Sequence, residues 1–288
     1  MTDYRSLWST YLYDLSFTQG FIDAGGVRTR YVQAGPKDAP AVIMLHGTGG
    51  SWENWCANIP YLSKHFNCVA FDMVGSGLTA KPDLDYEMPI YMAQLLGVID
   101  KLSLRKVSII GLSMGGWIGS AFAARHSELV DKLILLSSSG MIVDEANSAR
   151  IQQSRSSAVG NPTFESISTV FRTLIHDESK RMADLIALRL NIYSKPEMKI
   201  GMQHIVAMQG GEIRDRNLLR EEDWRSIKAP CLVIASLADR DVYLRTAEKI
   251  QEWVPNARLL KLEGVGHWIQ YEAQDIFNKT ALEFLRAE

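Results

Sequence analysis

Short, continuously apolar runs recur along most of this chain, and helix-like segments separate them. Two examples are Ala41–Leu45 and Val107–Ile110, and each is followed by polar or glycine residues. A strand that is apolar at every position is buried on both faces, as in a parallel sheet between two layers of helices. The pattern therefore predicts an α/β fold with a mostly parallel central sheet. The remaining predicted strands are Cys68–Phe71, Leu133–Leu136, Cys231–Ala235, Leu259–Leu262 and an antiparallel edge strand at Val27–Gln33.

The alternation of strand-like and helix-like segments stops between residues 141 and 225, where no strand-like run appears. We therefore predict one α/β core, formed by residues 1–140 and 226–288, that is interrupted by an all-helical lid of residues 141–225. A length of 288 residues suits one large domain with such an insertion. Three stretches of the lid have helical spacing: Phe164–His176, Glu178–Tyr193 and Glu197–Gln209.

The composition is that of an ordinary soluble globular protein. Hydrophobic residues make up 47% of the chain and charged residues 22%, and the formal net charge is −2. This balance favours neither a nucleic acid nor an anionic membrane as a partner. The cysteines Cys56, Cys68 and Cys231 are far apart and form no CxxC pair, so they suggest neither a metal site nor redox chemistry. We expect a reduced, cytoplasmic setting and no cofactor.

The N-terminal segment has the features of neither a secretory signal nor a membrane anchor. Asp3 and Asp14 interrupt it, and no stretch of the chain approaches the roughly 18–20 apolar residues of a membrane span. Its apolar side chains share one helical face, which predicts a short helix packed on the body of the protein or on a second subunit. The second arrangement would make the protein a homodimer. The side chains on this face are Leu7, Trp8, Tyr11, Leu12 and Leu15.

A serine lies between glycines just after the run Val107–Ile110. The stretch Gly111–Gly115 reads GLSMG, which matches G-x-S-x-G, and a helix-compatible segment follows it. In such a strand-to-helix turn the backbone is strained, and small flanking residues let neighbouring backbones approach closely. The serine hydroxyl is then exposed at the carboxyl edge of the sheet. We therefore predict that Ser113 is a catalytic nucleophile.

A serine nucleophile needs a base and an acid, because its hydroxyl is weakly reactive until its proton is removed. This motif supplies serine, acid and histidine in that chain order. His267 follows a strand run in the flexible loop GVGH and is the predicted base. The preceding strand continues into LADRDV, which offers Asp239 and Asp241. We favour Asp239, four residues after Ala235, as the acid that orients His267, with Asp241 as the alternative.

The negative oxygen that forms after serine attack needs backbone N–H donors. One is expected from Met114, the residue after the nucleophile. The other is expected from the loop HGTGG, at Thr48 or Gly49. We expect His46 to support this loop rather than to take part in catalysis.

With these elements placed, the sequence resembles the α/β-hydrolase family and, within it, the meta-cleavage-product hydrolases of bacterial aromatic degradation. The resemblance runs from about Phe21 to Phe284 and rests on AGGVRTRYVQAG, MLHGTGG, VAFDMVGSGLTAKPD, GLSMGGW and GVGHW. It implies the α/β-hydrolase fold with a helical lid and a serine-dependent hydrolase activity. Members cleave a carbon–carbon bond in vinylogous 1,5-diketone acids, which are ring-fission products that carry a dienoate carboxylate.

The resemblance also implies residues that bind the substrate. Arg189, in the lid stretch DLIALRLNIYSKPE, matches the family's carboxylate-binding arginine, and a guanidinium fits a carboxylate well. Asn54 matches a family asparagine near the acid end of the substrate. Leu112 stands beside the nucleophile, and Trp268 is expected to line the pocket beside His267. The expected partner is a small, aromatic-derived carboxylic acid.

Two departures from the family pattern support a second interpretation. Leu112 stands where the family often has asparagine, and the loop HGTGGS is shorter than the family's. Both suit a carboxylesterase that cleaves an aromatic or alkyl monoester with the same triad. Because all three triad residue types are retained, a non-catalytic ligand receptor is disfavoured. Ser113 likewise disfavours the dehalogenases and epoxide hydrolases, whose nucleophile is aspartate.

Overall fold

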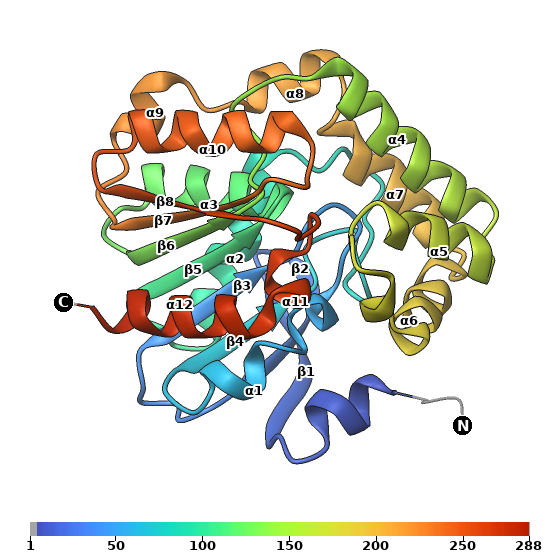
Figure 1. Cartoon of the computed structure of the whole chain (residues 1–288), viewed down its shortest axis with the longest axis horizontal. Helices are drawn as coiled ribbons and strands as arrows, with labels where there is room; N and C mark the ends of the chain where they lie inside the picture. The colour runs from blue at the N-terminus through green and yellow to red at the C-terminus, as the bar shows by residue number, and fades with distance from the viewer. Residues whose placement is uncertain (1–4, 288) are drawn as a thin grey trace.

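The computed structural model describes residues 5–287, and its centre is one eight-stranded sheet (Figure 1). β2 pairs antiparallel with both β1 and β4, and the remaining neighbours are parallel. The predicted α/β architecture with a mostly parallel sheet is therefore confirmed. In spatial order the strands are β1 (Phe17–Ala24), β2 (Val27–Ala34), β4 (Asn67–Phe71), β3 (Ala41–Leu45), β5 (Val107–Leu112), β6 (Val130–Leu136), β7 (Cys231–Ser236) and β8 (Ala257–Leu262).

Two layers of helices cover the sheet, which explains why β3, β4, β5 and β7 are buried at every position. On one face α2 (Met88–Lys101), α3 (Met114–Arg125) and α10 (Asp241–Trp253) pack against strands. On the other face α12 (Gln274–Arg286) packs with α1 (Ile59–Leu62) and α11 (Ile269–Glu272). Figure 1 shows α10 and α12 on opposite sides of the strands.

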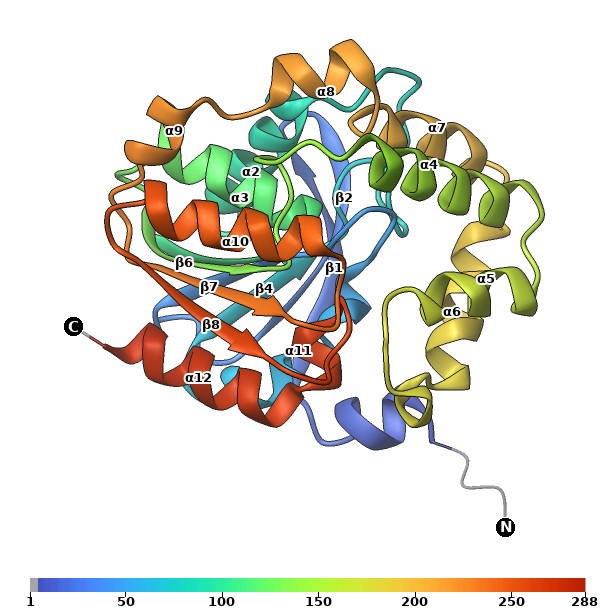
Figure 2. The same cartoon turned by 45° about the horizontal axis from the view of Figure 1, so that its top comes forward.

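The chain between β6 and β7 contains helices and no strand. Its helices pack on one another, α4 on α5 and α7, and α6 on α5 and α7. Figures 1 and 2 show them gathered on one side of the core. α9 (Glu221–Arg225) lies within the expected lid but packs on α3 and α10, so the helical cover ends before it. The covering helices are α4 (Glu145–Gly160), α5 (Phe164–Arg172), α6 (Ala183–Tyr193), α7 (Met198–Ala207) and α8 (Gly211–Asn217).

The N-terminal segment packs on its own core. Its short helix η1 (Trp8–Leu12) follows Leu7, and both Leu7 and Leu12 are buried. Tyr11 lies against Tyr271, with ring centroids 6.2 Å apart. Trp8 is expected on the buried face, but it is 54% exposed, because η1 is a π-helix and its spacing differs from the α-helical spacing on which the expectation rests. Residues 1–4, which include Asp3, lie outside the described residues.

Over residues 5–287, no helix has the combination of length and apolar character that crossing a membrane requires. The three cysteines, Cys56, Cys68 and Cys231, are buried as free thiols. Burial raises the pKa of each thiol above its ordinary value, which keeps the reactive thiolate form unpopulated.

A histidine joins the helical cover to the core. The two ring nitrogens of His204 in α7 lie 2.8 Å from Asp85 and 2.8 Å from Asp83, in the loop before α2. Since an ionised carboxylate only accepts hydrogen bonds, both nitrogens donate and the ring is protonated. Burial opposes protonation, but the bonds to Asp85 and Asp83 outweigh it and raise the pKa of His204 above its ordinary 6.5.

We expect this contact to stabilise the fold at low pH only. Because the pKa is raised on folding, the contribution is complete below about pH 6.5 and is lost as pH rises through the higher folded value. Asp83 and Asp85 are exposed, so the pairs contribute about 1 kcal/mol, or about 2–3 °C in Tm. His204→Gln should therefore lower Tm at pH 6 and have little effect at pH 9. The control is His65→Gln, which removes a half-buried ring that faces Arg286. An equal loss at both pH values would contradict the prediction.

Candidate active site

Ser113 occupies the sharp bend between β5 and α3. Its backbone has φ 55° and ψ −116°, a combination that non-glycine residues rarely adopt and that a surrounding structure must enforce. The flanking glycines make room for the bend. A Cβ atom on Gly111 would lie 2.5 Å from the carbonyl oxygen of Gly115, and one on Gly115 would lie 2.3 Å from that of Leu45. The fold therefore holds a serine at the carboxyl end of β5.

His267 and Asp239 meet at the ends of β8 and β7. The Nδ1 atom of His267 lies 2.6 Å from Oδ2 of Asp239, and both side chains are almost fully buried. The backbone N–H of Arg240 donates to the other carboxylate oxygen at 2.8 Å. Burial alone would raise the pKa of Asp239, but the His267 ring and these hydrogen bonds lower it below its ordinary value. The carboxylate is therefore ionised and can orient the ring.

The alternative acid lies elsewhere. Asp241 is the first residue of α10, its side chain is 75% exposed, and it pairs with Arg245 at 2.7 Å. The structure therefore brings Asp239, and not Asp241, to His267.

One pocket between the sheet edge and the helical cover is lined by both Ser113 and His267. The two side chains thus face the same space, although they are 154 positions apart in the sequence. The four residues expected to bind substrate, Asn54, Leu112, Arg189 and Trp268, line this pocket as well. Ser113 also lines a second, more apolar pocket, whose walls include Trp117, Ile142, Val143 and Val242.

The loop after β3 lies beside the start of α3. Thr48 lines the pocket, and its hydroxyl contacts the sulfur of Met114 at 3.9 Å. Met114 is the first residue of α3, where a backbone N–H has no acceptor within the helix. Gly49 instead lies against the lid, because its carbonyl accepts a hydrogen bond from the Tyr193 hydroxyl at 3.1 Å. Thr48 and Met114 are therefore the two expected donors that the fold places together.

His46 supports this loop from below. It is fully buried, its Nδ1 contacts the carbonyl of Gly47 at 2.7 Å, and its Nε2 accepts from the N–H of Met73 at 3.0 Å. These partners require a neutral ring with its proton on Nδ1. Burial lowers the pKa of His46 to about 4, which keeps the ring neutral.

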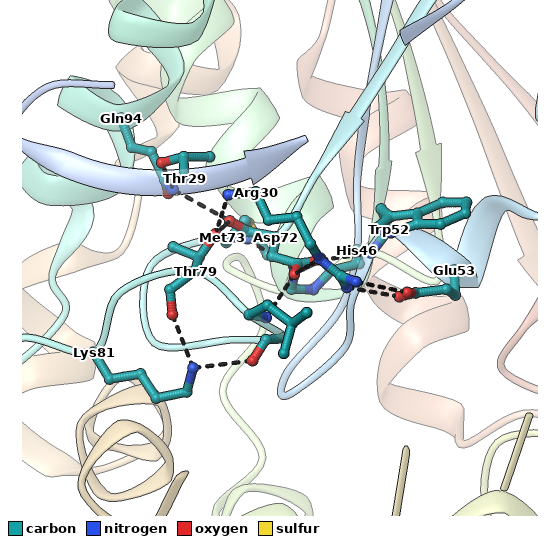
Figure 3. Close-up of polar contacts among 12 residues, drawn as sticks. Thr29, Arg30, His46, Trp52, Glu53, Asp72, Met73, Thr79, Lys81 and Gln94 are labelled. Atoms are coloured by element: carbon teal, nitrogen blue, oxygen red, sulfur yellow. Dashed lines mark hydrogen bonds and ion pairs between the residues drawn. The ribbon is translucent and has the colours of Figure 1, made fainter. Parts of the chain in front are cut away.

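A buried ionic cluster fixes the turn that carries Asn54 (Figure 3). Arg30 Nε lies 2.6 Å from Asp72 Oδ2, and Arg30 Nη1 lies 2.9 Å from Glu53 Oε1. The other oxygen of Asp72 accepts from the N–H of Trp52 at 2.9 Å. The first two residues of the turn η2 (Trp52–Trp55) are thus tied to Arg30 in β2 and to Asp72, just after β4. The position of Asn54 is therefore set by charged pairs beneath the pocket.

Arg189 reaches the pocket from α6 and is only 3% exposed. Its Nη2 donates to Oδ1 of Asn54 at 3.1 Å. Its guanidinium also lies over the rings of Phe171 and Tyr193, 5.7 and 5.5 Å from their centroids. These contacts hold the side chain in place while most of its N–H donors stay free for an anion.

Several residues at this site are not predictable from the sequence. Arg150 and Arg155 of α4 and Arg240 also line the pocket. Glu272 accepts the N–H groups of Gly266, His176 and Asp177 at 2.7, 2.9 and 2.6 Å, and so holds the histidine loop against the lid. No local motif marks any of these positions, because each depends on how distant segments meet.

The chain is similar in sequence to known hydrolases. The alpha/beta hydrolase fold family matches residues 40–274. The 2-hydroxy-6-oxo-6-(2'-aminophenyl)hexa-2,4-dienoic acid hydrolase of Metapseudomonas resinovorans is 31% identical over 279 residues, which cover 94% of this chain and 91% of that protein. The 2-hydroxy-6-oxo-2,4-heptadienoate hydrolase of Pseudomonas putida F1 is 27% identical over 92% of this chain and 95% of its own length.

A solved structure shares the architecture. The meta-cleavage product hydrolase CumD of Pseudomonas fluorescens IP01, in a serine-to-alanine form complexed with acetates, is 28% identical with a TM-score of 0.78. The match covers 95% of this chain and 98% of that one. The similarity therefore extends over the core and the helical cover alike.

Proposed function

Because the chain belongs to the alpha/beta hydrolase family and is related to its meta-cleavage product hydrolases, we propose that it cleaves a carbon–carbon bond in a ring-fission product of aromatic degradation. The proposed substrate is a 2-hydroxy-6-oxo-hexa-2,4-dienoate with a further substituent at C6. Ser113 is the proposed nucleophile, His267 the base and Asp239 the acid that orients it. The observation that carries the proposal is that His267 contacts Asp239 and lines the same pocket as Ser113.

The first proposed step converts the dienol into a ketone. The 2-hydroxyl group loses its proton, C5 gains one, and the remaining double bond lies between C3 and C4. The C5–C6 bond then lies next to a conjugated carbonyl that can accept its bonding electrons. Arg189 and Asn54, which contact each other in the pocket, are placed to hold the C1 carboxylate during this step.

The second proposed step is attack on the C6 carbonyl. The Ser113 oxygen bonds to C6 while His267 accepts its proton, and the N–H groups of Thr48 and Met114 stabilise the new oxyanion. The C5–C6 bond then breaks, and its electron pair passes into the dienolate, which takes a proton. Water, deprotonated by His267, releases the acyl group from Ser113 as a carboxylic acid. One water molecule is consumed and no other co-reactant is needed.

The buried arginine favours carbon–carbon cleavage over simple ester hydrolysis. An ester needs only the nucleophile, its base and the oxyanion donors. A dienoate also needs its carboxylate held while the proton moves, and Arg189 is buried against Asn54 with donors to spare. Keeping such a charge out of water is costly unless an anion binds it.

We predict that the substitution Arg189→Gln lowers activity on acidic substrates and leaves activity on neutral ones nearly unchanged. With a dienoate, kcat/KM should fall about 10- to 100-fold, since hydrogen bonds to a charged group contribute about 1.5–3 kcal/mol. With a neutral aryl ester the change should stay within about threefold. Steady-state kinetics on both compounds check this, with Arg225→Gln, a change to an exposed arginine on α9, as the control. Equal losses on both substrates would remove the case for carboxylate recognition.

Carboxylesterase activity is the second candidate function, and the apolar residue Leu112 in the pocket supports it. Purified protein should be given a 2-hydroxy-6-oxo-hexa-2,4-dienoate and a set of aryl and alkyl monoesters. Loss of the ring-fission chromophore supports the proposal. If the protein hydrolyses only the esters, the carbon–carbon hydrolase proposal fails and the carboxylesterase function takes its place.

A further inference from the structure

The pocket of Ser113 is strongly cationic. Four arginines line it, whereas no aspartate or glutamate is among its described lining residues. Arg189 comes from α6, Arg150 and Arg155 from α4, and Arg240 from the loop after β7. The nearby Asp239 contacts His267 and also lies 3.9 Å from Nη1 of Arg240, so its charge offsets Arg240 and leaves Arg150, Arg155 and Arg189 uncompensated. The pocket therefore holds more positive charge than one dienoate carboxylate compensates.

The two arginines of α4 contact neutral groups only. Arg155 is 6% exposed; its Nε donates to the Thr48 carbonyl at 3.4 Å and its Nη1 to the Ser154 hydroxyl at 3.3 Å. Arg150 donates from Nη2 to Asn147 at 2.9 Å, and its buried Nε has no partner. Within residues 5–287, no carboxylate forms an ion pair with Arg150 or Arg155.

Among the described residues, the buried arginines outside this pocket are paired. Arg30, 4% exposed, contacts both Asp72 and Glu53, and Arg214, 7% exposed, contacts Glu145 at 2.8 Å. A buried arginine with a structural role in this fold therefore forms an ion pair with a carboxylate. The absence of such a partner at Arg150 and Arg155 is specific to the pocket.

Unpaired charges of this kind are unfavourable in the free protein. Burial and the charge of Arg240 lower the pKa of Arg150 to about 10, and burial also lowers the pKa of Arg155. Both groups stay protonated near neutral pH. Each would be stabilised by an anion that enters the pocket and supplies the missing hydrogen-bond acceptors.

We propose that the substrate carries a second carboxylate and that Arg150 and Arg155 bind it. The inference rests on the proposed function, which assigns the dienoate carboxylate to Arg189 and Asn54. The substrate class is then a vinylogous 1,5-diketone with two carboxylic acid groups. The second product of cleavage, the acid released from Ser113, would itself be a dicarboxylic acid if that carboxylate lies on the C6 side.

A different role for Arg155 makes a different prediction. Because its Nε contacts the carbonyl of Thr48, it could act only by positioning the oxyanion loop. Its loss would then lower kcat by the same factor for every substrate. A carboxylate-binding role instead raises KM, and it does so more for dicarboxylates than for monocarboxylates.

The test uses pairs of compounds that differ only in the second acid. Each pair is a 2-hydroxy-6-oxo-2,4-diene-dioate, with its second carboxylate at C8, C9 or C10, and the monoacid of the same chain length. We expect at least one dioate to have a kcat/KM about tenfold or more above its monoacid. Arg155→Met should lower kcat/KM about 10- to 100-fold more for that dioate than for its monoacid. Arg225→Met is the control and should leave the ratio unchanged.

Two results would overturn the proposal. One is an equal kcat/KM for dioate and monoacid at every length. The other is an Arg155→Met variant that loses kcat equally on both members of each pair. Thermal unfolding separates these effects from misfolding: removing an unpaired buried charge should keep or raise Tm. A fall in Tm together with an unchanged dioate preference would assign Arg155 to the structure instead.

A binding experiment keeps the inference separate from the proposed reaction. If no dienoate is cleaved, the proposed function fails. The carboxylate subsite formed by Arg150 and Arg155 is then tested by ligand binding to the Ser113→Ala protein. We expect adipate to raise its Tm more than hexanoate does, and the difference to disappear in the Ser113→Ala/Arg155→Met protein. Equal shifts with adipate and hexanoate would overturn the subsite.

Discussion

Replacing Ser113 with alanine is expected to lower kcat about 10³-fold or more for every substrate the enzyme turns over. The variant keeps the pocket and the oxyanion donors but has no oxygen to form the acyl intermediate. Initial rates followed by chromophore loss measure the effect. Ser157→Ala, a change on the exposed face of α4, is the matched control and should retain full activity. A Ser113→Ala rate within tenfold of the unmodified enzyme would remove Ser113 from the mechanism.

Replacing Asp239 with asparagine is expected to lower kcat about 10³- to 10⁴-fold. The substitution keeps the shape of the side chain, but it removes the charge that stabilises protonated His267 and offers an amide where the ring now donates to a carboxylate oxygen 2.6 Å away. The same steady-state assay checks it.

Asp241→Asn is the matched control for this prediction. Asp241 begins α10 with an exposed side chain paired to Arg245, so its loss should leave kcat unchanged. The reverse outcome, an inactive Asp241→Asn and an active Asp239→Asn, would exchange the roles of the two residues.

The core strands were predictable because their signal is local. Ala41–Leu45 is apolar at every position and is β3 with the same ends, and Val107–Ile110 forms most of β5. The bend at Ser113 was predictable because a short motif marks it: Gly111 is required by its close approach to Gly115 within the turn, although Gly115 also makes room for the carbonyl of Leu45 in β3. Sequence patterns succeed where the physical cause lies within a few residues.

Elements with exposed or polar surfaces were not predictable. β1 is an edge strand with several exposed residues, and no apolar run in the sequence marks it. α4 reads EANSARIQQSRSSAVG, which has too few apolar residues for a helical pattern, and it was also missed. Missing α4 concealed Arg150 and Arg155, because no residue near them in the sequence points to a pocket.

Contacts between residues far apart in the sequence could be identified only from the folded structure. The sequence offered Asp239 and Asp241 as acids, and only the meeting of the loops after β7 and β8 places one of them on His267. The role of Glu272 in holding Gly266 and His176 likewise depends on three segments that come together. Arg189 was assigned through resemblance, since a lone arginine on a helix is ordinarily a surface residue.

The most direct test of the central claim is product analysis after the purified protein acts on 2-hydroxy-6-oxo-hexa-2,4-dienoates with C6 substituents, including the dioates described above. The account predicts loss of the chromophore and equal amounts of two products, 2-hydroxypenta-2,4-dienoate and the carboxylic acid derived from C6. It also predicts that both products form about 10³-fold or more slowly with the Ser113→Ala protein. Dienoates that remain intact while simple esters are hydrolysed would contradict the account.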